Sequence, residues 1–519
     1  MELLNNWKKN LYVLSLLAFL LALPTSVAFI TGTIIALFVV WILTGNYKEK
    51  WNRLIHNRNA LLLMSIPLLY LLGLAFTNHF NIGFQELNKS LSWFFFAFIL
   101  GSSPPVSHKI TLRLLGIYIA TVTLAAAAAL LTIIYSKVNP FFNFRSVTWI
   151  DHIPFSYQIG FSIWLLIYFM MNEKISKLVK LSLLLLISFL FVTLLALKSW
   201  NGYLYFSVMS ISAFIFLIWN SKKKILKLAF ICGLILTIAL PTLYIYHCVQ
   251  KFYNITEYSP EDIPQYTPNG NLYHHDFQDK TKENGNYVML FICDEELIPL
   301  WNARSQKKYD DETSDGYSFG NILIRYMTSK GLRKDAAGFA QLSQKDIDNI
   351  ENEITNHIYA THKLSIYPRI YETIWEIDIY LMDKNPNNKS LAQRIEQALL
   401  AFHIIKKNVW VGIGLGNNAD AYDRAIMDSE SKLAHQITGS AHDQYLNYLI
   451  RFGILGTLYI LGVLLWVFFT GRKNNPFLLT IFFVSILVTN FGEANWETFI
   501  GLNFFAFFFC FFMWIAPKK

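Results

Sequence analysis

The chain has 519 residues, of which 54% are hydrophobic and only 15% are charged. Soluble globular domains carry about 25% charged residues, so the composition excludes an ordinary soluble protein. A formal net charge of +9 would suit a nucleic-acid-binding protein, but much of the Lys and Arg lies in short segments between apolar runs, as in membrane proteins. We therefore expect a membrane protein that binds no nucleic acid.

Apolar runs long enough to cross the hydrocarbon of a bilayer recur along the chain. By this length criterion we predict an all-α polytopic membrane protein with about twelve membrane-spanning helices. The predicted spans lie at 10–23, 25–45, 59–76, 87–102, 112–135, 155–171, 178–198, 201–219, 225–247, 444–470, 475–490 and 496–515. About nine of them form an N-terminal membrane domain at 1–250, and about three form C-terminal membrane helices at 442–519.

The Lys and Arg residues orient these helices, because cytoplasmic loops of membrane proteins carry an excess of cations. With a cytoplasmic N-terminus, these cations gather in the inside loops, which are 46–58, 102–113, 172–180, 221–227 and 471–475. The short outside loops 77–86 and 491–496 contain neither Lys nor Arg. The exceptions on the outside are Lys89, Lys137 and Arg145, and the cations at the C-terminus, which fall inside, are Lys518 and Lys519. We therefore expect both termini in the cytoplasm.

One long hydrophilic segment, 251–441, falls outside the cytoplasm in this orientation. Aromatic and aliphatic residues spread through it, as at 287–292, so it can bury a small core. We predict a mainly α loop domain, with helical periodicity at 368–383 and most clearly at 390–408. The helix at 390–408 has one apolar stripe, so it could lie along the outer surface of the bilayer. The glycines at 412–417 that follow are interpreted as turn geometry, although their N–H groups could contact phosphate.

The segment where the chain re-enters the membrane holds the first candidate for catalysis. Ser440 can cap the new helix, with Asp443 completing a box-like pattern, and this places His442 in the first turn. The positive end of a helix disfavours a charged imidazole, so His442 would stay neutral and able to accept a proton. A general base for a hydroxyl group needs this property. The alternative is an interfacial histidine bound to water or to lipid headgroups.

Three ordered motifs resemble the O-antigen ligase and polymerase superfamily, in the form found in Bacteroidetes. Residues 441–456 read AHDQYLNYLIRFGILG, like the family motif in which His-Asn or His-Asp opens a helix that ends in Gly-x-x-Gly. Residues 390–417 read SLAQRIEQALLAFHIIKKNVWVGIGLGN, like the family's arginine followed by an amphipathic helix and a GxGxGN turn. Residues 492–509 read GEANWETFIGLNFFAFFF, like the last outer turn and final helix of relatives.

The resemblance implies a glycan transferase of the O-antigen ligase type in the bacterial inner membrane. Its donor would be a glycan on undecaprenyl diphosphate and its acceptor a hydroxyl of lipid A–core at the periplasmic face, with no nucleotide sugar, metal or other cofactor. An O-antigen polymerase or a protein O-oligosaccharyltransferase would share the donor and differ in the acceptor. A transporter of lipid-linked glycan is a further alternative, but the sequence shows neither repeated halves nor mid-membrane polar residues clearly.

The resemblance also assigns roles to three residues. His442 would be the catalytic base, and Arg394, which matches the family arginine, would bind the diphosphate through its planar fork. Lys198 stands near the place of a second family arginine and could supply its charge without the same geometry. For both cations the alternative is a surface side chain that reaches toward water. Glu493 and Glu497 could orient a cation or the acceptor, but we interpret them as ordinary interfacial acids.

Overall fold

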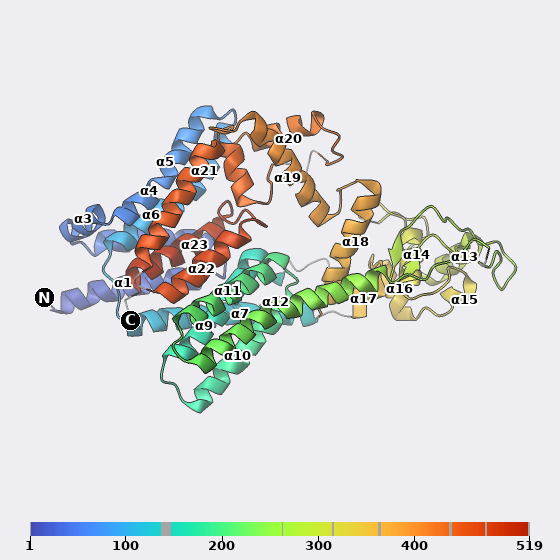
Figure 1. Cartoon of the computed structure of the whole chain (residues 1–519), viewed down its shortest axis with the longest axis horizontal. Coiled ribbons are helices and arrows are strands. Elements are labelled where there is room, and N and C mark those ends of the chain that lie inside the picture. Colours follow the sequence, from blue (N-terminus) through green and yellow to red (C-terminus); the bar gives the residue numbers. More distant parts are fainter. Residues whose placement is uncertain are drawn as a thin grey trace. The chain divides into compact units, whose positions relative to one another are not determined.

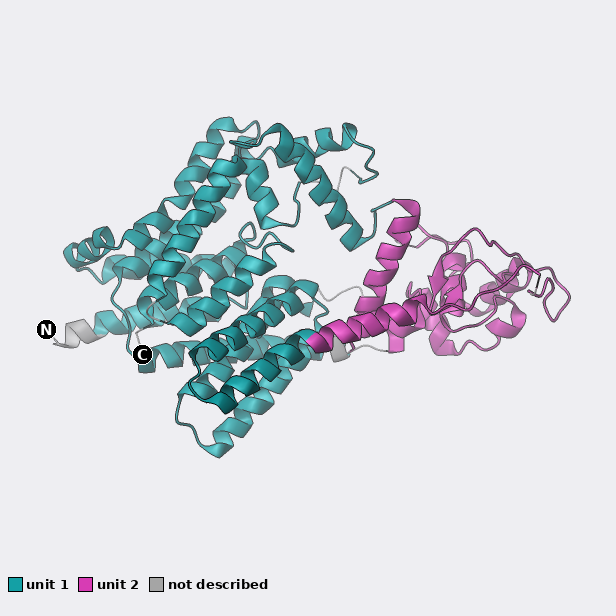
Figure 2. Cartoon of the chain, in the orientation of Figure 1, with its two compact units in different colours: residues 1–135, 144–238, 385–519 teal, residues 136–143, 239–384 magenta. Residues whose placement is uncertain are grey.

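The computed structural model describes residues 2–135, 147–261, 263–313, 316–361, 365–434, 439–472 and 475–516. The cations Lys137, Arg145, Lys518 and Lys519, whose side of the membrane the sequence predicts, lie outside these residues. Helices make up 71% of the structure. The chain divides into two compact units, shown in teal and magenta in Figure 2, which are residues 1–135, 144–238 and 385–519 for unit 1 and residues 136–143 and 239–384 for unit 2.

Unit 1 is built from helices that can be followed along the chain in Figure 1. They are α1 (Glu2–Ala22), α2 (Val27–Leu43), α3 (Tyr47–His56), α4 (Arg58–Met64), α5 (Ile66–Gly73), the 3₁₀ turn η1 (Leu74–Phe76), α6 (Phe80–Ser102), α7 (His108–Tyr135), α9 (His152–Asn172), α10 (Lys177–Ala196), α11 (Trp200–Asn220), α19 (Ser390–Lys407), α20 (Asn418–Met427), α21 (Gln444–Gly471), α22 (Pro476–Thr489), α23 (Phe499–Cys510) and the π-helical turn η3 (Phe511–Ile515). Helix α12 (Lys224–Tyr253) begins in unit 1 and ends in unit 2.

Seven helical segments of the described residues are long and apolar enough to cross a membrane. They are Arg58–Phe76, His108–Thr132, His152–Asn172, Lys177–Ala196, Trp200–Asn220, Lys224–Tyr253 and Gln444–Gly471. An eighth is obtained if α2 and α3, which are bent by 115° at a short break, count as one span. Length and composition thus support a helical membrane protein.

Each of the twelve predicted apolar spans coincides with a helix or with a run of consecutive helices. Eight of the predicted spans correspond to the seven long apolar segments and to α2. The other four correspond to α1, to α6, to α22, which has 14 residues, and to α23 with its π-helical turn. Helices α22 and α23 are shorter than the roughly 20 residues that span a bilayer without tilt. A count of seven to eight spans is therefore what these helices support, and twelve stays a prediction.

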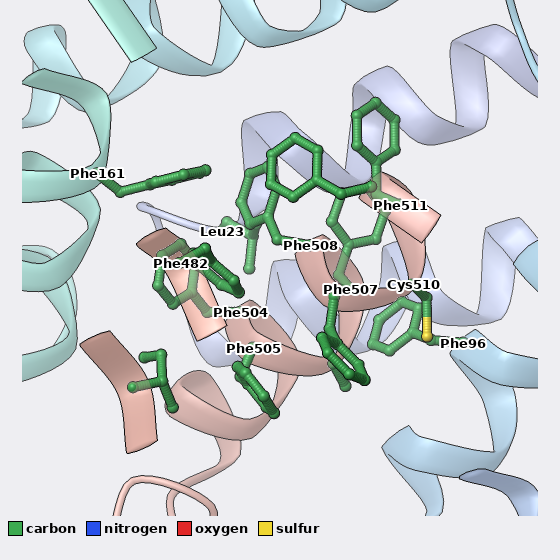
Figure 3. Close-up of a cluster of buried hydrophobic side chains, with 14 of the residues drawn as sticks. Leu23, Phe96, Phe161, Phe482, Phe504, Phe505, Phe507, Phe508, Cys510 and Phe511 are labelled. Atoms are coloured by element: carbon green, nitrogen blue, oxygen red, sulfur yellow. The ribbon is translucent and has the colours of Figure 1, made fainter. Parts of the chain in front are cut away.

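Helix α23 lies at the centre of unit 1. Every residue from Ile500 to Cys510 is buried, as expected of a helix that is hydrophobic all round. Its phenylalanines contact rings of several other helices: the ring centroids of Phe507 and of Phe19 on α1 are 4.5 Å apart. The centroids of Phe508 and of Phe161 on α9 are 4.8 Å apart (Figure 3). Phe482 of α22 lies 5.3 Å from Phe504. This packing fixes the turn at 490–498, which leads from α22 into α23.

Helix α12 shows the opposite pattern. Its most apolar stretch has a mean hydropathy of 2.3, yet none of that stretch is buried inside the structure. Side chains such as Leu236, Leu240 and Leu243 are more than half exposed. In water, this surface would be a large exposed apolar patch. Lipid hydrocarbon can cover the apolar side chains, and the backbone needs no water there because its hydrogen bonds lie within the helix.

Unit 2 is a small, mainly helical body with one two-stranded sheet among its described residues. Its elements are β1 (Lys282–Glu283), β2 (Asn286–Tyr287), α13 (Asp294–Arg304), α14 (Phe319–Ser329), α15 (Ala336–Phe339), α16 (Gln344–Glu351), α17 (His357–Thr361) and α18 (Tyr367–Asp383). The strands are antiparallel, with Glu283 opposite Asn286. Glu283 is fully buried and accepts hydrogen bonds from Arg325, Asn356 and Tyr371, at 2.6 to 2.9 Å. The periodicity at 368–383 corresponds to α18.

The predicted helix at 390–408 corresponds to α19, which belongs to unit 1. Its buried face consists of Ala392, Gln397, Leu400, Ala401 and Ile404. On the opposite face, the apolar side chains of Ile395, Leu399 and Phe402 are 41 to 57% exposed, and the predicted position of this face along the bilayer surface stays a prediction. The predicted domain limits at 250 and 441 follow polarity, whereas the two units follow compactness, and those limits stay a prediction.

Candidate active site

The start of α21 differs from the sequence expectation at His442. Asp443, rather than Ser440, is the cap: its carboxylate accepts hydrogen bonds from the N–H groups of Tyr445 and Leu446, at 2.8 and 2.9 Å. An aspartate at this position satisfies the free N–H groups of the first turn. The prediction that His442 lies in the first turn is therefore wrong. His442 precedes the cap, in a left-handed conformation with φ of 49°.

The loop before the cap is fixed by Asn447, which is fully buried on α21. Its side-chain oxygen accepts a hydrogen bond from the N–H of Ala441 at 2.9 Å, and its amide donates to the hydroxyl of Ser440 at 3.0 Å. Ser440 also accepts the N–H of His442 at 3.2 Å. These contacts determine where the imidazole of His442 emerges.

Glu493, in the turn at 490–498, brings two of the predicted site residues together. Its Oε1 lies 3.3 Å from Nδ1 of His442. Its Oε2 accepts a hydrogen bond from Nη2 of Arg394 at 3.1 Å, while Nη1 of Arg394 donates to the carbonyl of Gly492 at 2.6 Å. Arg394 comes from the first turns of α19, so three separate stretches of the chain converge on one carboxylate. We refer to His442, Arg394 and Glu493 as the carboxylate-centred cluster.

The exposure of these side chains fits a site that a ligand can reach. Glu493 is only 12% exposed, whereas the side chains of His442 and Arg394 are 39% and 32% exposed. Burial by itself raises the pKa of Glu493, but the hydrogen bond with His442 and the charge of Arg394 outweigh it, so the pKa lies below its ordinary value. The carboxylate is therefore ionised at neutral pH. With Nδ1 of His442 facing it, the other ring nitrogen, Nε2, is the one left for a substrate.

Asn201, which no sequence pattern indicates, also contacts the carboxylate-centred cluster. Its amide donates to Oε2 of Glu493 at 3.1 Å and to the carbonyl of Gly492 at 3.3 Å. Asn201 lies in the first turn of α11, whose cap is Ser199. Lys198 lies just before this cap, 7% exposed and with φ of 49°. Its burial argues against a side chain that reaches water, and its proposed role in substrate binding stays a prediction.

A second ionic group surrounds Arg451 of α21, which is more buried than Arg394. Its guanidinium is 3.0 Å from a carboxylate oxygen of Glu86 on α6 and 2.6 Å from one of Glu497. The side chain of Arg451 is 6% exposed and those of the two acids are 14% and 17% exposed. Glu497 therefore pairs with a buried arginine, which agrees with the expectation that it could orient a cation. An arginine inside a predicted span is the signal that could have identified this group.

The glycine turn at 412–417 packs against the ionic group around Arg451. The N–H of Gly414 donates to the carbonyl of Arg451 at 3.0 Å, and that of Gly416 donates to Glu86 at 3.2 Å. A Cβ on Gly412 would lie 2.4 Å from the backbone carbon of Arg451, and one on Gly453 would lie 2.3 Å from that of Trp410. Both glycines have positive φ. The turn thus requires glycine for close backbone packing, and these two N–H groups serve the protein rather than a phosphate.

The fold and the site together define a class of protein. The chain is a helical membrane protein in which a histidine, an arginine and an ionised carboxylate meet in a partly exposed cluster, an arrangement suited to proton transfer beside an anionic group.

Comparison with known proteins shows which family part of the chain is similar to. Residues 337–461 match the O-antigen ligase family. The predicted resemblance to this superfamily is confirmed, and the matched segment contains Arg394, His442 and Arg451. No curated protein matches the chain. The family supports, in general terms, a glycosyl-transferring enzyme of a bacterial membrane, a ligase or a polymerase, that acts on lipid-linked glycan.

Proposed function

We propose that the protein transfers a glycan from undecaprenyl diphosphate to a hydroxyl of lipid A–core at the periplasmic face of the inner membrane. The observation that carries the proposal is the convergence of His442 and Arg394 on Glu493. One of these side chains can accept a proton and the other can bind a diphosphate. The family match supplies the substrate class, and the acceptor follows from the resemblance to O-antigen ligases.

His442 is the general base in this proposal. Its Nε2 removes the proton from the acceptor hydroxyl, and the oxygen then attacks the anomeric carbon of the donor glycan. The ring becomes an imidazolium, which the carboxylate of Glu493 stabilises at Nδ1, 3.3 Å away. This pairing replaces the helix-end argument of the sequence analysis, because His442 lies outside α21. The stabilisation appears as the positive charge develops, so it lowers the barrier rather than only strengthening substrate binding.

Arg394 binds the leaving group. As the new glycosidic bond forms, the bond between the anomeric carbon and the diphosphate oxygen breaks, and undecaprenyl diphosphate departs with the electron pair. Attack from the opposite face inverts the anomeric centre. A guanidinium has five N–H donors, and the contacts to Gly492 and Glu493 account for two of them. The remaining donors, on a side chain 32% exposed, can hold phosphate oxygens. Lys198 adds a second cation in this proposal.

The experiment that tests the proposed function is donor turnover by the full-length protein in proteoliposomes. Vesicles receive an undecaprenyl-diphosphate glycan and lipid A–core, and the products are separated by mass. We expect loss of the donor, release of undecaprenyl diphosphate and growth of the acceptor by one glycan. Growth of the donor glycan itself would instead identify a polymerase. Movement of intact donor across the bilayer without cleavage would contradict the proposal and identify a transporter.

Glu493→Gln tests whether the carboxylate orients His442. The amide keeps the shape of the side chain but not its charge, so the imidazolium loses its partner, and we expect turnover to fall by about 10- to 100-fold. Because the pKa of Glu493 is lowered, the carboxylate is ionised throughout the neutral range. Wild-type turnover should therefore exceed that of Glu493→Gln from neutral pH down to the ordinary carboxyl pKa. The difference should disappear as the pH falls through the lowered pKa of Glu493.

The pH profile of turnover, together with rescue by Glu493→Asp, is the readout for this variant. A purely structural role for Glu493 would lower the amount of folded protein without changing the shape of the profile. Equal turnover by wild type and Glu493→Gln at neutral pH would remove the carboxylate from the mechanism.

A further inference from the structure

Unit 1 contains a pocket whose lining residues all come from the first 106 residues of the chain and include none of the carboxylate-centred cluster. It has a volume of about 360 Å³ and is formed by the start of α1, the turn and helix that follow α2, and the segment between α6 and α7. The lining residues that could meet a ligand through charge or a hydroxyl include Lys8, Lys9, Tyr12, Glu49, Lys50 and Arg53. The Lys and Arg pattern assigns all three of these segments to the cytoplasmic side.

Charge is the main property of this pocket. Lys8, Lys9, Lys50 and Arg53 contribute four cations, and Glu49 is the only acid among the lining residues. Glu49 is already paired with Arg53, at 2.8 Å between Oε1 and Nη2. The three lysines therefore face the pocket without a carboxylate of their own among its lining residues. A cavity lined by cations in this way is complementary to an anion.

Lys50 is the most confined of these cations, since it is only 7% exposed. Its ammonium donates to the carbonyl of Trp41 and to the hydroxyl of Thr44, the second at 2.7 Å, which leaves one of its three protons for a ligand. Burial, together with the charge of Lys8, lowers the pKa of Lys50 to about 8. Burial and the neighbouring cation thus destabilise the charged form of Lys50, and an anion in the pocket would stabilise it.

Tyr12 gives independent support for a ligand. Its side chain is 8% exposed, and its hydroxyl interacts with that of Ser103 without forming a hydrogen bond of good geometry. Buried hydroxyl groups normally have partners, because an unpaired one costs free energy. Tyr12 lines the same pocket as the hydroxyl-bearing Ser102 and Ser103. The pocket therefore offers both a charge and a hydrogen-bond donor to an oxyanion.

Helix α3 places this pocket at a membrane surface. It is bent by 115° away from α2, and Tyr47, Trp51 and Ile55 on it are 44 to 61% exposed. Residues spaced by four lie on one face of a helix, and a helix with aromatic residues on one face and cations on the other lies in the bilayer interface. Arg53 and Lys50 come from the same helix. The pocket is thus at the depth of lipid headgroups.

We propose that this pocket binds a phosphate group, and that the phosphate belongs to the headgroup of an anionic phospholipid in the cytoplasmic leaflet. Basic pockets between membrane helices on the cytoplasmic side hold such headgroups. The lysines meet the phosphate oxygens, the hydroxyl of Tyr12 donates to one of them, and the acyl chains extend beside the apolar face of α3. The headgroup thereby bridges residues of α1 and α3.

Native mass spectrometry of the full-length protein in detergent tests this proposal, with phosphatidylglycerol and phosphatidylcholine as probes. We expect the wild type to bind phosphatidylglycerol in preference to phosphatidylcholine. In Lys8→Gln/Lys9→Gln we expect binding of phosphatidylglycerol to weaken by roughly 30-fold, since each cation near a membrane surface contributes about 1 kcal/mol. The matched control is Lys222→Gln/Lys223→Gln, which removes two exposed cations from the same predicted side and should leave binding unchanged.

A variant that is expected to bind more tightly distinguishes loss of the binding site from loss of folded protein. Glu49→Gln removes the one acid from the pocket and should tighten binding of phosphatidylglycerol by about fivefold. Three outcomes would overturn the proposal: equal weakening in the two double variants, unchanged binding in Lys8→Gln/Lys9→Gln, and displacement of the lipid by millimolar inorganic phosphate. The last of these would assign the pocket to a soluble phosphate.

Discussion

His442→Ala is expected to lower glycan transfer by about 10²- to 10⁴-fold, the usual contribution of a positioned general base. Without the imidazole, no other group of the carboxylate-centred cluster can take the hydroxyl proton at neutral pH: Arg394 stays protonated, and Glu493 is ionised but 12% exposed and occupied by its three partners. Turnover in proteoliposomes, measured at saturating donor, gives the change directly.

The control for this variant is His403→Ala. His403 lies on α19 and its side chain is 39% exposed, the same fraction as that of His442, but its acidic neighbour is Asp428, at 3.8 Å. We expect His403→Ala to transfer glycan at nearly the wild-type rate. If His442→Ala were as active as this control, the proposed base would be wrong. A normal amount of membrane-inserted His442→Ala protein is part of the expected result.

Arg451→Met should have the largest effect on stability, because it leaves Glu86 and Glu497 buried without their common cation. Removing one partner of a buried ionic group costs about 3–5 kcal/mol. We expect the variant to lose its native elution profile in detergent at a clearly lower temperature than the wild type. Arg472→Met makes the same change at an exposed residue just after α21 and should behave as wild type.

A triple variant separates the charge effect from the loss of packing. Glu86→Gln, Glu497→Gln and Arg451→Met together remove all three charges, and well-packed neutral replacements of buried ion pairs are often tolerated. The triple variant should therefore be more stable than Arg451→Met alone. If it is not, the destabilisation would come from the shape of the arginine side chain rather than from uncompensated acids.

The sequence predicts the helices well, because the information that forms them is local. The predicted span at 155–171 and the observed α9 (His152–Asn172) differ by three residues or fewer at each end, as do the predicted helix 390–408 and α19 (Ser390–Lys407). Hydropathy and periodicity within one segment decide both. The cap of α21 is Asp443 rather than the predicted Ser440, since both residue types are good caps and only the backbone path selects between them.

The partners of the site could not be predicted in the same way. Glu493 lies 51 residues from His442, 99 from Arg394 and 292 from Asn201 along the chain. A single sequence shows which side chains can carry charge or transfer a proton. It does not show which distant segments come into contact in the fold. The motif resemblance identified His442 and Arg394 individually, yet it did not identify the carboxylate that both contact. Arg451 was missed although an arginine in an apolar span is a recognisable signal.

The position of α23 has a consequence for the order of events during synthesis. The helices whose rings it contacts, among them α1 at Phe19, α6 at Phe96 and α9 at Phe161, are all made earlier. At about 5–20 residues per second, the ribosome needs on the order of a minute to travel from Phe19 to Phe507. Through that interval the rings of the early helices lack the partner that buries them, so this part of unit 1 can reach its final packing only after α23 has been synthesised.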